Sequence, residues 1–339
     1  MVTIAKLIEK IETRQPVMNK LELTGSALAL QMQGFARLDK ATSQQIGFLA
    51  QAKYAYTLTQ SNAGVAIVTD GVEVPQNTVA LVVSSPYLAY ASCSQLFDTA
   101  LVANIHPTAN IADSAVIGKD VVIGAYASIG EHTKIGNGTQ IAANVVIEED
   151  CLIGKNCVIK PNVAIASQTQ IGNDVRVHNG ASIGSEGFGF APTKNPADAG
   201  EQAGWERIVQ LGRVIIGNHV RIGANTCIDR GAIDDTVIED NVIIDNLVQI
   251  AHNVHIGAGS AIAANTGIAG STRLGKRCIV AGAVGIAGHL AICDDVTITA
   301  MTMVIKSINQ SGTYSSGIPV MPSNDWKRAV VHFRKSGKK

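Results

Sequence analysis

Aromatic residues are scarce in this sequence: Phe, Trp and Tyr together make up 4% of its 339 residues. Glycine occurs 33 times, and Ile and Val dominate the apolar residues. This composition suits a core built from thin, repeated layers better than one large globular centre. The length is sufficient for two or three domains.

Excess charge and long apolar runs are also missing. The 27 Lys and Arg balance the 27 Asp and Glu, so no overall field favours nucleic acid or an anionic membrane. No uncharged apolar run is long enough for a membrane-spanning helix, and residues 1–11 alternate charged and apolar side chains, which argues against a secretory signal. The six cysteines form no CxxC pair. We therefore expect a cytoplasmic protein with no nucleic-acid partner and no stable membrane insertion.

A hexad repeat dominates the rest of the chain. From Ile105 to Ile183 every sixth residue is Ile or Val, and a second run extends from Ile216 to Val304 with one shift after Ile228. Small or β-branched residues lie two positions earlier, and Gly often follows. This period is typical of a parallel β-helix in which each hexad forms one wall and one corner. Three hexads close a coil, so positions three hexads apart stack at about 4.8 Å.

The pattern divides the chain into three regions. Residues 1–102 lack the hexad and predict a small α/β domain, with a helix over 3–11 and strands over 65–68 and 79–83. The hexads occupy residues 103–305. A long Gly- and Pro-containing loop at 185–213 interrupts them, and loops of this length are usually functional or disordered.

Residues 306–339 form a C-terminal extension. Ser323 is a candidate N-cap for a helix over 324–335. From residue 323 onward there are six Lys or Arg against one Asp, including Lys327, Arg328, Arg334 and Lys335. Such a run is usually a solvated face, but here it also concentrates positive charge at one end of a neutral chain, as steering of an acidic partner requires.

Three motifs resemble the UDP-3-O-acylglucosamine N-acyltransferase family of lipid A biosynthesis. They are Ile-Asp-Arg-Gly-Ala-Ile-Asp-Asp-Thr at 228–236, Asp-Asn-Leu-Val-Gln-Ile-Ala-His-Asn-Val at 245–254, and Tyr-Ser-Ser-Gly-Ile-Pro at 314–319. The resemblance implies a homotrimer of left-handed parallel β-helices, each with an N-terminal uridine-binding domain and a C-terminal helical extension. The usual crossover rule would favour a right-handed path, so left-handedness depends on the resemblance alone.

The resemblance also implies the reaction. A 3-hydroxyacyl group passes from the thioester of acyl carrier protein to the 2-amine of UDP-3-O-acylglucosamine, giving UDP-2,3-diacylglucosamine. The donor group is the phosphopantetheine arm of the carrier, and no cofactor is bound permanently.

Acyl transfer to an amine needs a general base and a donor for the oxyanion. His252 lies at a corner two positions after inward Ile250, and its Gln-Ile-Ala-His-Asn context matches the family's catalytic histidine. The alternative is an exposed surface histidine. Gly270 follows three hexads later, one coil along, where its amide could stabilise the oxyanion; the alternative is a plain corner glycine.

Two more residues are catalytic candidates. His289 lies one position beyond two full coils from His252, hence about 10 Å away, and the resemblance makes it a second histidine that contacts substrate. Asp245 could orient His252, as carboxylates do for basic imidazoles. Because Asp245 lies on a different wall, that contact would require a neighbouring subunit.

Candidate substrate contacts lie in two places. Phe48 and Tyr54 could stack on uracil, with Lys53 near a phosphate; without the resemblance, this segment would be a helix with two core aromatics. The family segment reads FLxNPKY, and here Gln-Ala replaces Asn-Pro at 51–52. Asn246 and Gln249 are candidate sugar contacts, or ordinary turn residues.

Near the end of the solenoid, Met301 and Met303 are candidate walls of an apolar groove for the acyl chain. Where this groove ends would set the acyl chain length.

Other functions stay open. The nearest competitor is an acetyl-CoA-dependent sugar-nucleotide acetyltransferase. A zinc enzyme of the γ-carbonic anhydrase type could use His252 and His255, although two histidines so close together at a corner need not converge, and we expect no metal. A scaffolding solenoid would leave the long loop, the aromatic pair and the basic tail unexplained.

Overall fold

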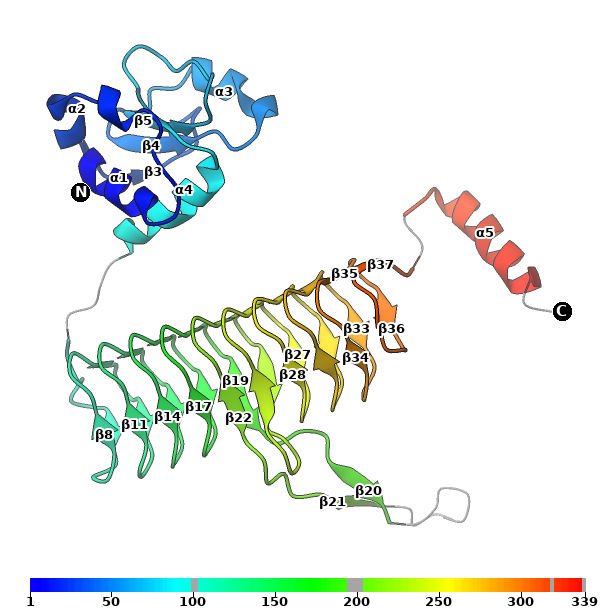
Figure 1. The fold of residues 1–339 in the computed structure, drawn as a ribbon. Coiled ribbons are helices and arrows are strands. Elements are labelled where there is room, and N and C mark those ends of the chain that lie inside the picture. Colours follow the sequence, from blue (N-terminus) through cyan, green and yellow to red (C-terminus); the bar gives the residue numbers. More distant parts are fainter. Residues whose placement is uncertain (99–102, 194–203, 318–319, 337–339) are drawn as a thin grey trace. The chain divides into compact units, whose positions relative to one another are not determined.

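A computed structural model describes residues 1–98, 103–193, 204–317 and 320–336 of the chain. The chain divides into two compact units, Met1–Ala100 and Leu101–Lys339 (Figure 1). The last two lysines of the basic tail, Lys338 and Lys339, lie outside the described residues. Among the described residues, no helix combines the length and the apolar character needed to cross a membrane.

The first unit is a small α/β domain around a parallel sheet. Its sheet has the order β3 (Gly34–Phe35), β4 (Gln45–Phe48), β5 (Val65–Val68) and β6 (Val79–Val82), and a separate antiparallel pair joins β1 (Val2–Thr3) to β2 (Gln31–Met32). The helices are α1 (Ile4–Glu12), α2 (Gly25–Ala29), α3 (Tyr56–Thr59) and α4 (Pro86–Ser94), with 3₁₀ turns at Lys20–Glu22, Ala52–Tyr54 and Gln95–Phe97.

The predicted first helix and the two predicted strands are confirmed. Helix α1 begins after Thr3, whose hydroxyl accepts the N–H of Lys6, and it buries its apolar face. Strand β5 is buried along its whole length, as expected for a central parallel strand.

The second unit is a parallel β-solenoid with three walls, so the predicted β-helix is confirmed. Wall 1 contains β7 (Asn110–Ile111), β10 (Ser128–Ile129), β13 (Val146–Ile147), β16 (Ala164–Ile165), β19 (Ser182–Ser185), β24 (Cys227–Asp229), β27 (Gln249–Ile250), β30 (Gly267–Ile268), β33 (Gly285–Ile286) and β36 (Met303–Val304). Wall 2 contains β8 (Val116–Ile117), β11 (Lys134–Ile135), β14 (Leu152–Ile153), β17 (Gln170–Ile171), β22 (Val214–Ile216), β25 (Thr236–Ile238), β28 (His255–Ile256), β31 (Arg273–Leu274) and β34 (Ala291–Ile292). Wall 3 contains β9 (Val122–Ile123), β12 (Gln140–Ile141), β15 (Val158–Ile159), β18 (Arg176–Val177), β23 (Arg221–Ile222), β26 (Ile243–Ile244), β29 (Ala261–Ile262), β32 (Ile279–Val280), β35 (Val296–Ile298) and β37 (Gly312–Tyr314).

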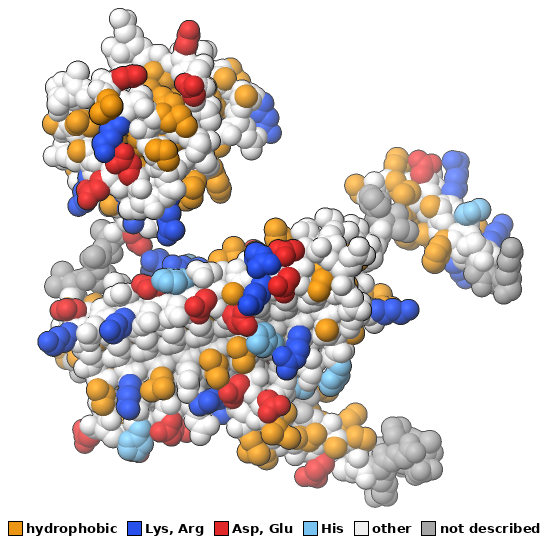
Figure 2. All heavy atoms as spheres, in the orientation of Figure 1, with side chains coloured by type: hydrophobic (Ala, Val, Ile, Leu, Met, Phe, Trp, Pro, Cys, Tyr) orange, Lys and Arg blue, Asp and Glu red, His pale blue; other side chains and the backbone are white. Residues whose placement is uncertain are grey.

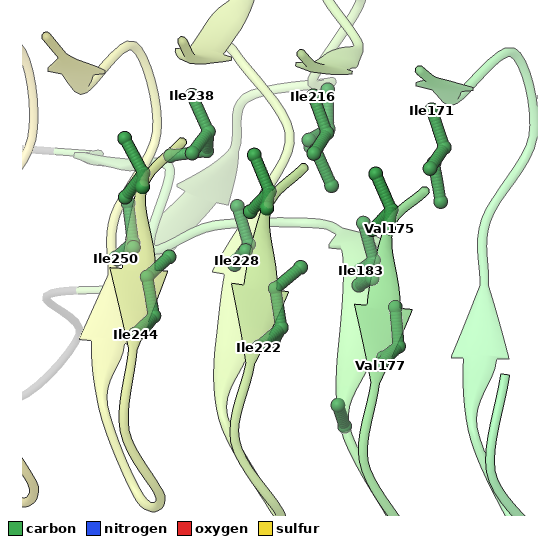
Figure 3. Close-up of a cluster of buried hydrophobic side chains, with 14 of the residues drawn as sticks. Ile171, Val175, Val177, Ile183, Ile216, Ile222, Ile228, Ile238, Ile244 and Ile250 are labelled. Carbon is green, nitrogen blue, oxygen red and sulfur yellow. The ribbon is translucent and has the colours of Figure 1, made fainter. Parts of the chain in front are cut away.

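The hexad isoleucines fill the axis of the solenoid. Figure 3 shows them stacked coil upon coil, with Ile222 and Ile244 on one wall and Ile228 and Ile250 on another. From Ile123 onward each is buried, whereas Ile111 and Ile117 are half-buried and Ile105 is 46% exposed, because at the start of the solenoid a coil stacks on one side only. Stacked aliphatic layers replace the aromatic core that the composition excludes.

Three cysteines occupy the small inward position, as the hexad predicts. Cys151, Cys157 and Cys278 are completely buried. Burial raises the pKa of the Cys151 thiol to about 11 and also raises the pKa of Cys157 and Cys278. These thiols are therefore packing groups rather than nucleophiles.

Tight corners connect the walls. A Cβ atom on Gly136 would lie 2.6 Å from the backbone of the next coil, so a side chain at this corner would force the backbone to shift. Further along most corners, one residue has a left-handed backbone; Asn162 (φ 61°) and Asn253 (φ 60°) are examples. Asn and Asp tolerate this conformation better than most residues.

Two insertions interrupt the regular coils. In the first, β20 (Phe190–Pro192) pairs antiparallel with β21 (Trp205–Arg207), forming a hairpin that projects from the solenoid (Figure 1). In the second, residues 230–235 lengthen one coil. Cys227 therefore pairs with Gln249, whereas a regular coil of three hexads would pair it with residue 245. The C-terminal helix α5 (Ser323–Ser336) begins one position earlier than predicted and buries no residue.

Candidate active site

His252 lies at the corner between β27 on wall 1 and β28 on wall 2, and its side chain is half-buried. Its imidazole ring covers Gly270. A Cβ atom on Gly270 would lie 2.6 Å from Cε1 and 2.7 Å from Nε2 of His252, so any larger residue here would displace the ring. The Ser271 N–H donates to the His252 carbonyl at 2.9 Å, which confirms the predicted register of one coil.

The backbone N–H of Gly270 is a candidate oxyanion donor. Its neighbours are paired: the Ala269 N–H donates to the Ile286 carbonyl, and the Ser271 N–H to the His252 carbonyl. No acceptor for the Gly270 N–H is found within the described part of the chain. A free amide beside a basic ring is the combination that a tetrahedral intermediate requires.

Asn253 is the direct partner of the His252 ring. The Nδ1 atom of His252 lies 3.0 Å from Oδ1 of Asn253. Asp245 lies elsewhere: its carboxylate accepts the N–H of Asn246 at 2.8 Å and that of Ala264 at 3.2 Å. Within one chain, as expected, Asp245 does not orient the ring.

Asp229 is an acidic neighbour of His252 that the sequence analysis quoted in a motif without giving it a role. A Cβ atom on Gly187, at the root of the long loop, would lie 3.2 Å from Cβ of His252 and 3.4 Å from Cβ of Asp229. Burial raises the pKa of the Asp229 carboxyl, while hydrogen bonds from Gln249 and Ser185 and the charge of His252 act in the opposite direction. The loop therefore packs one glycine against both groups.

The predicted sugar contacts have backbone or side-chain partners of their own. Gln249 donates from Nε2 to Oδ2 of Asp229 at 2.9 Å, which ties it to the neighbourhood of His252. Asn246 accepts the N–H of Ala224 at 2.6 Å, a typical turn contact. Their roles in sugar binding stay predictions.

His289 is exposed and lies two coils beyond His252, as predicted. Its N–H donates to the Gly270 carbonyl at 2.9 Å. Its left-handed backbone (φ 59°) corresponds to that of Asn253 and Ser271 in the earlier coils. The register thus places His289 one position past the column that contains His252 and Gly270.

Two successive glycines, Gly267 and Gly285, leave a strip of wall 1 without outward side chains beside this corner. The outward positions of successive strands are Gln249, Gly267, Gly285 and Met303. A Cβ atom on either glycine would meet nothing within 4 Å, so the space above the strip is open. Met303, 68% exposed, stands at its end, whereas Met301 lies on the corner before β36.

The first unit contains a cavity of about 470 Å³ lined by both predicted stacking residues. Phe48 ends β4 and Tyr54 belongs to a 3₁₀ turn, so the alternative of a single helix is wrong. One face of Phe48 stacks on Tyr90, with ring centroids 4.4 Å apart. Lys53 lies 4.9 Å above the Tyr54 ring.

Sequence analysis missed two residues of this cavity. Tyr87, from the first turn of α4, and Arg37 also line it. Arg37 forms an ion pair with Asp39 at 2.9 Å. The cavity therefore combines aromatic faces with a guanidinium, as a nucleotide site would.

His255 does not join His252 in a common site. Its Nε2 atom lies 2.8 Å from Oε1 of Glu239, and this hydrogen bond lowers the pKa of that carboxyl. Over the described ranges, no group of three or more His, Cys, Asp or Glu could hold a metal ion.

The basic residues of α5 are exposed along a helix without buried contacts. Lys327, Arg328 and Lys335 line a shallow depression together with Val331. Arg328 lies 3.5 Å from Asp325 within the same helix.

Comparison with known proteins covers the whole chain. The family model of UDP-3-O-(3-hydroxymyristoyl) glucosamine N-acyltransferase matches residues 29–96. Models of the bacterial transferase hexapeptide match residues 114–149, 150–185 and 235–270, and a hexapeptide repeat of succinyl-transferase matches residues 213–246.

Relatives extend these matches to full length. The UDP-3-O-acylglucosamine N-acyltransferase of Psychrobacter arcticus is 59% identical over 341 residues, covering 100% of both chains. The protein of the same name from Hahella chejuensis is 49% identical over 315 residues, covering 92% of this chain and 88% of its own. The solved Arabidopsis UDP-N-acetylglucosamine acyltransferase shares the fold, with a TM-score of 0.55 and 24% identity over 67% of this chain and 77% of that one. The chain therefore belongs to the UDP-3-O-acylglucosamine N-acyltransferase family of lipid A acyltransferases.

Proposed function

We propose that this enzyme transfers a 3-hydroxyacyl group from acyl carrier protein to the 2-amine of UDP-3-O-acylglucosamine. The products are UDP-2,3-diacylglucosamine and carrier protein with a free phosphopantetheine thiol. One observation carries the proposal: the His252 ring lies directly over Gly270, whose N–H has no acceptor in the described part of the chain. All six cysteines are free thiols, which agrees with a reducing cytoplasm.

The chemistry follows from these two groups. The neutral imidazole of His252 removes a proton while the sugar amine attacks the thioester carbonyl. The Gly270 N–H donates to the oxygen that becomes negative in the tetrahedral intermediate. Collapse of the intermediate forms the amide and breaks the C–S bond, and the proton passes from His252 to the departing thiolate. His289, two coils on, contacts the pantetheine arm.

The substrate groups are assigned to three regions. Phe48 and Tyr54 stack on the uracil, with Lys53 beside a phosphate. Asn246 and Gln249 contact the sugar, and Asp245 from a neighbouring subunit approaches His252. The acyl chain lies along the glycine strip of wall 1 and ends at Met303, with Met301 beside it.

A homotrimer would complete this site. In Figure 2, hydrophobic side chains gather around the base of the β20–β21 hairpin. Phe188, Trp205 and Leu211, from the first insertion, and Ile233, from the second, are exposed. Ile233 is 81% exposed in the single chain. Exposed apolar patches of this kind mark contact surfaces, and a neighbour here would exclude water from His252. A fully active monomer in analytical ultracentrifugation would contradict the trimer.

Product analysis tests the function. We expect the purified protein, given UDP-3-O-acylglucosamine and 3-hydroxyacyl carrier protein, to yield a sugar nucleotide heavier by one acyl group bound as an amide. Mass spectrometry after mild alkaline hydrolysis distinguishes the amide, which survives, from an ester. Transfer from acetyl-CoA with no transfer from the carrier thioester would favour the acetyltransferase alternative instead.

Charge reversal in α5 tests the carrier surface. Replacing Lys327, Arg328, Arg334 and Lys335 by Glu should raise the KM for the carrier thioester and flatten its salt dependence, because these exposed charges act on encounter. The kcat should stay near the wild-type value. A fall in kcat with unchanged KM and salt response would show that the helix does not serve the donor.

A further inference from the structure

We propose that Asn253 is a positioning residue that holds neutral His252 in the tautomer with its proton on Nδ1. The Nε2 lone pair is then the one available to accept the proton of the amine. This inference rests on the proposed role of His252 as the general base. The family motif contains both residues, but nothing in the sequence alone assigns the asparagine a task.

The orientation of the Asn253 amide is fixed by two backbone groups. The Ala232 N–H donates to Oδ1 of Asn253 at 3.0 Å, and Nδ2 of Asn253 donates to the Asp234 carbonyl at 2.8 Å. An N–H can only donate and a carbonyl can only accept. The reversed amide would bring donor against donor and acceptor against acceptor, so Oδ1 is the atom that faces His252.

This orientation of the Asn253 amide determines which ring nitrogen of neutral His252 carries the hydrogen. Oδ1 of Asn253, 3.0 Å from Nδ1 of His252, is an acceptor only. Nδ1 must therefore carry the hydrogen, and in a neutral imidazole the other nitrogen is then the acceptor. The same nitrogen, Nε2, lies above Gly270, where a Cβ atom would come within 2.7 Å of it. The basic nitrogen thus lies next to Gly270, whose N–H has no acceptor in the described part of the chain.

The inserted residues 230–235 supply both fixing groups. They lie in the coil beneath His252. This coil, from Cys227 to Gln249, is longer than the next coil, from Gln249 to Gly267, which contains three hexads. Immediately after the inserted residues, the Thr236 hydroxyl accepts the Asn253 N–H at 2.8 Å. Asn253 therefore makes three hydrogen bonds to residues 232–236. The left-handed backbone alone does not require Asn, because Ser271 and His289 occupy the equivalent position in the next two coils.

The neighbouring carboxylate does not perform this task. Oδ2 of Asp229 accepts from Gln249 at 2.9 Å, and Oδ1 accepts from the Ser185 hydroxyl at 3.4 Å. Both carboxylate oxygens of Asp229 thus have other partners, whereas Asn253 makes the hydrogen bond to the His252 ring.

Two substitutions separate tautomer control from packing. Asn253→Leu removes the acceptor, so the Nε2–H tautomer gains population and kcat should fall about 10- to 100-fold, with the KM for the UDP-sugar nearly unchanged. Asn253→Asp retains an acceptor and should recover most of kcat. Its carboxylate favours the imidazolium, so the acid limb of the kcat profile should move to higher pH. Asn241→Leu is the matched control, because Asn241 has the same left-handed backbone (φ 59°).

The tautomer itself is measured by NMR on full-length protein labelled with ¹⁵N in histidine only, with His252→Gln identifying the His252 signals. We expect the wild type and Asn253→Asp to show protonated Nδ1 at neutral pH, and Asn253→Leu to show protonated Nε2. Protonated Nε2 in the wild type, or an unchanged tautomer in a slow Asn253→Leu variant, would overturn the proposal. An active His252→Ala variant would instead remove the proposed base, whatever tautomer the wild type shows.

Discussion

The variant His252→Ala should lose about 10²- to 10⁴-fold in kcat, the usual contribution of a positioned general base. Its KM for UDP-3-O-acylglucosamine should remain near the wild-type value, because uridine binding is assigned to Phe48 and Tyr54 in the first unit. Loss of kcat without loss of binding identifies an interaction made in the transition state. Steady-state kinetics with both substrates measure the two effects.

Stability must be measured on the same variant. His252 lies at a corner outside the isoleucine axis, so its removal opens no axial cavity and should change the free energy of unfolding by less than about 1 kcal/mol. His219→Ala, at a distant exposed corner beside Asp174, should retain wild-type activity. A large fall in melting temperature for His252→Ala would mean that the activity loss reports unfolding.

The variant Gly270→Ala should lose about 10²-fold in kcat although no polar group is removed. The new Cβ would lie 2.6 Å from the His252 ring, which must therefore move away from the amide beneath it. A displacement of about 1 Å in a catalytic group costs a loss of this size. The backbone of Gly270 is outside the left-handed region, so alanine itself introduces no backbone strain.

Gly282→Ala is the matched control for this substitution. Gly282 occupies the same hexad position as Gly270, but its new Cβ would lie 3.4 Å from the Ala264 carbonyl and would meet no histidine. We expect Gly282→Ala to keep its kcat within a factor of about 3. Equal losses in the two variants would mean that the solenoid corner, and not the His252–Gly270 contact, is responsible.

The solenoid could be predicted because one strong periodicity determines it. An inward isoleucine in every hexad leaves few other ways to bury the same side chains, and the coil of three hexads then places Gly270 beneath His252. Local sequence signals also predicted elements of the first unit: Thr3 caps α1, and the apolar run Val65–Val68 forms the buried strand β5. The hand of the helix did not follow from these patterns, since only the resemblance indicated it.

Contacts made through insertions could not be predicted in this way. Hexad arithmetic assumes that every coil contains three hexads, but residues 230–235 make the coil below His252 longer, and this insertion brings Ala232 and Asp234 to Asn253. Gly187 reaches His252 from an irregular loop, for which no period exists. The cavity in the first unit likewise joins Arg37 and Tyr87, which are far apart in the sequence.

The most direct test of the account is the pH dependence of the chemical step itself. Single-turnover amide formation, with enzyme in excess and both substrates saturating, removes contributions from binding and product release. We predict that the wild-type rate falls on the acid side as the base becomes protonated, and that folded His252→Ala is slow and lacks this limb. A folded His252→Ala protein that forms the amide at the wild-type rate, with the same acid limb, would contradict the assignment of His252 as the general base.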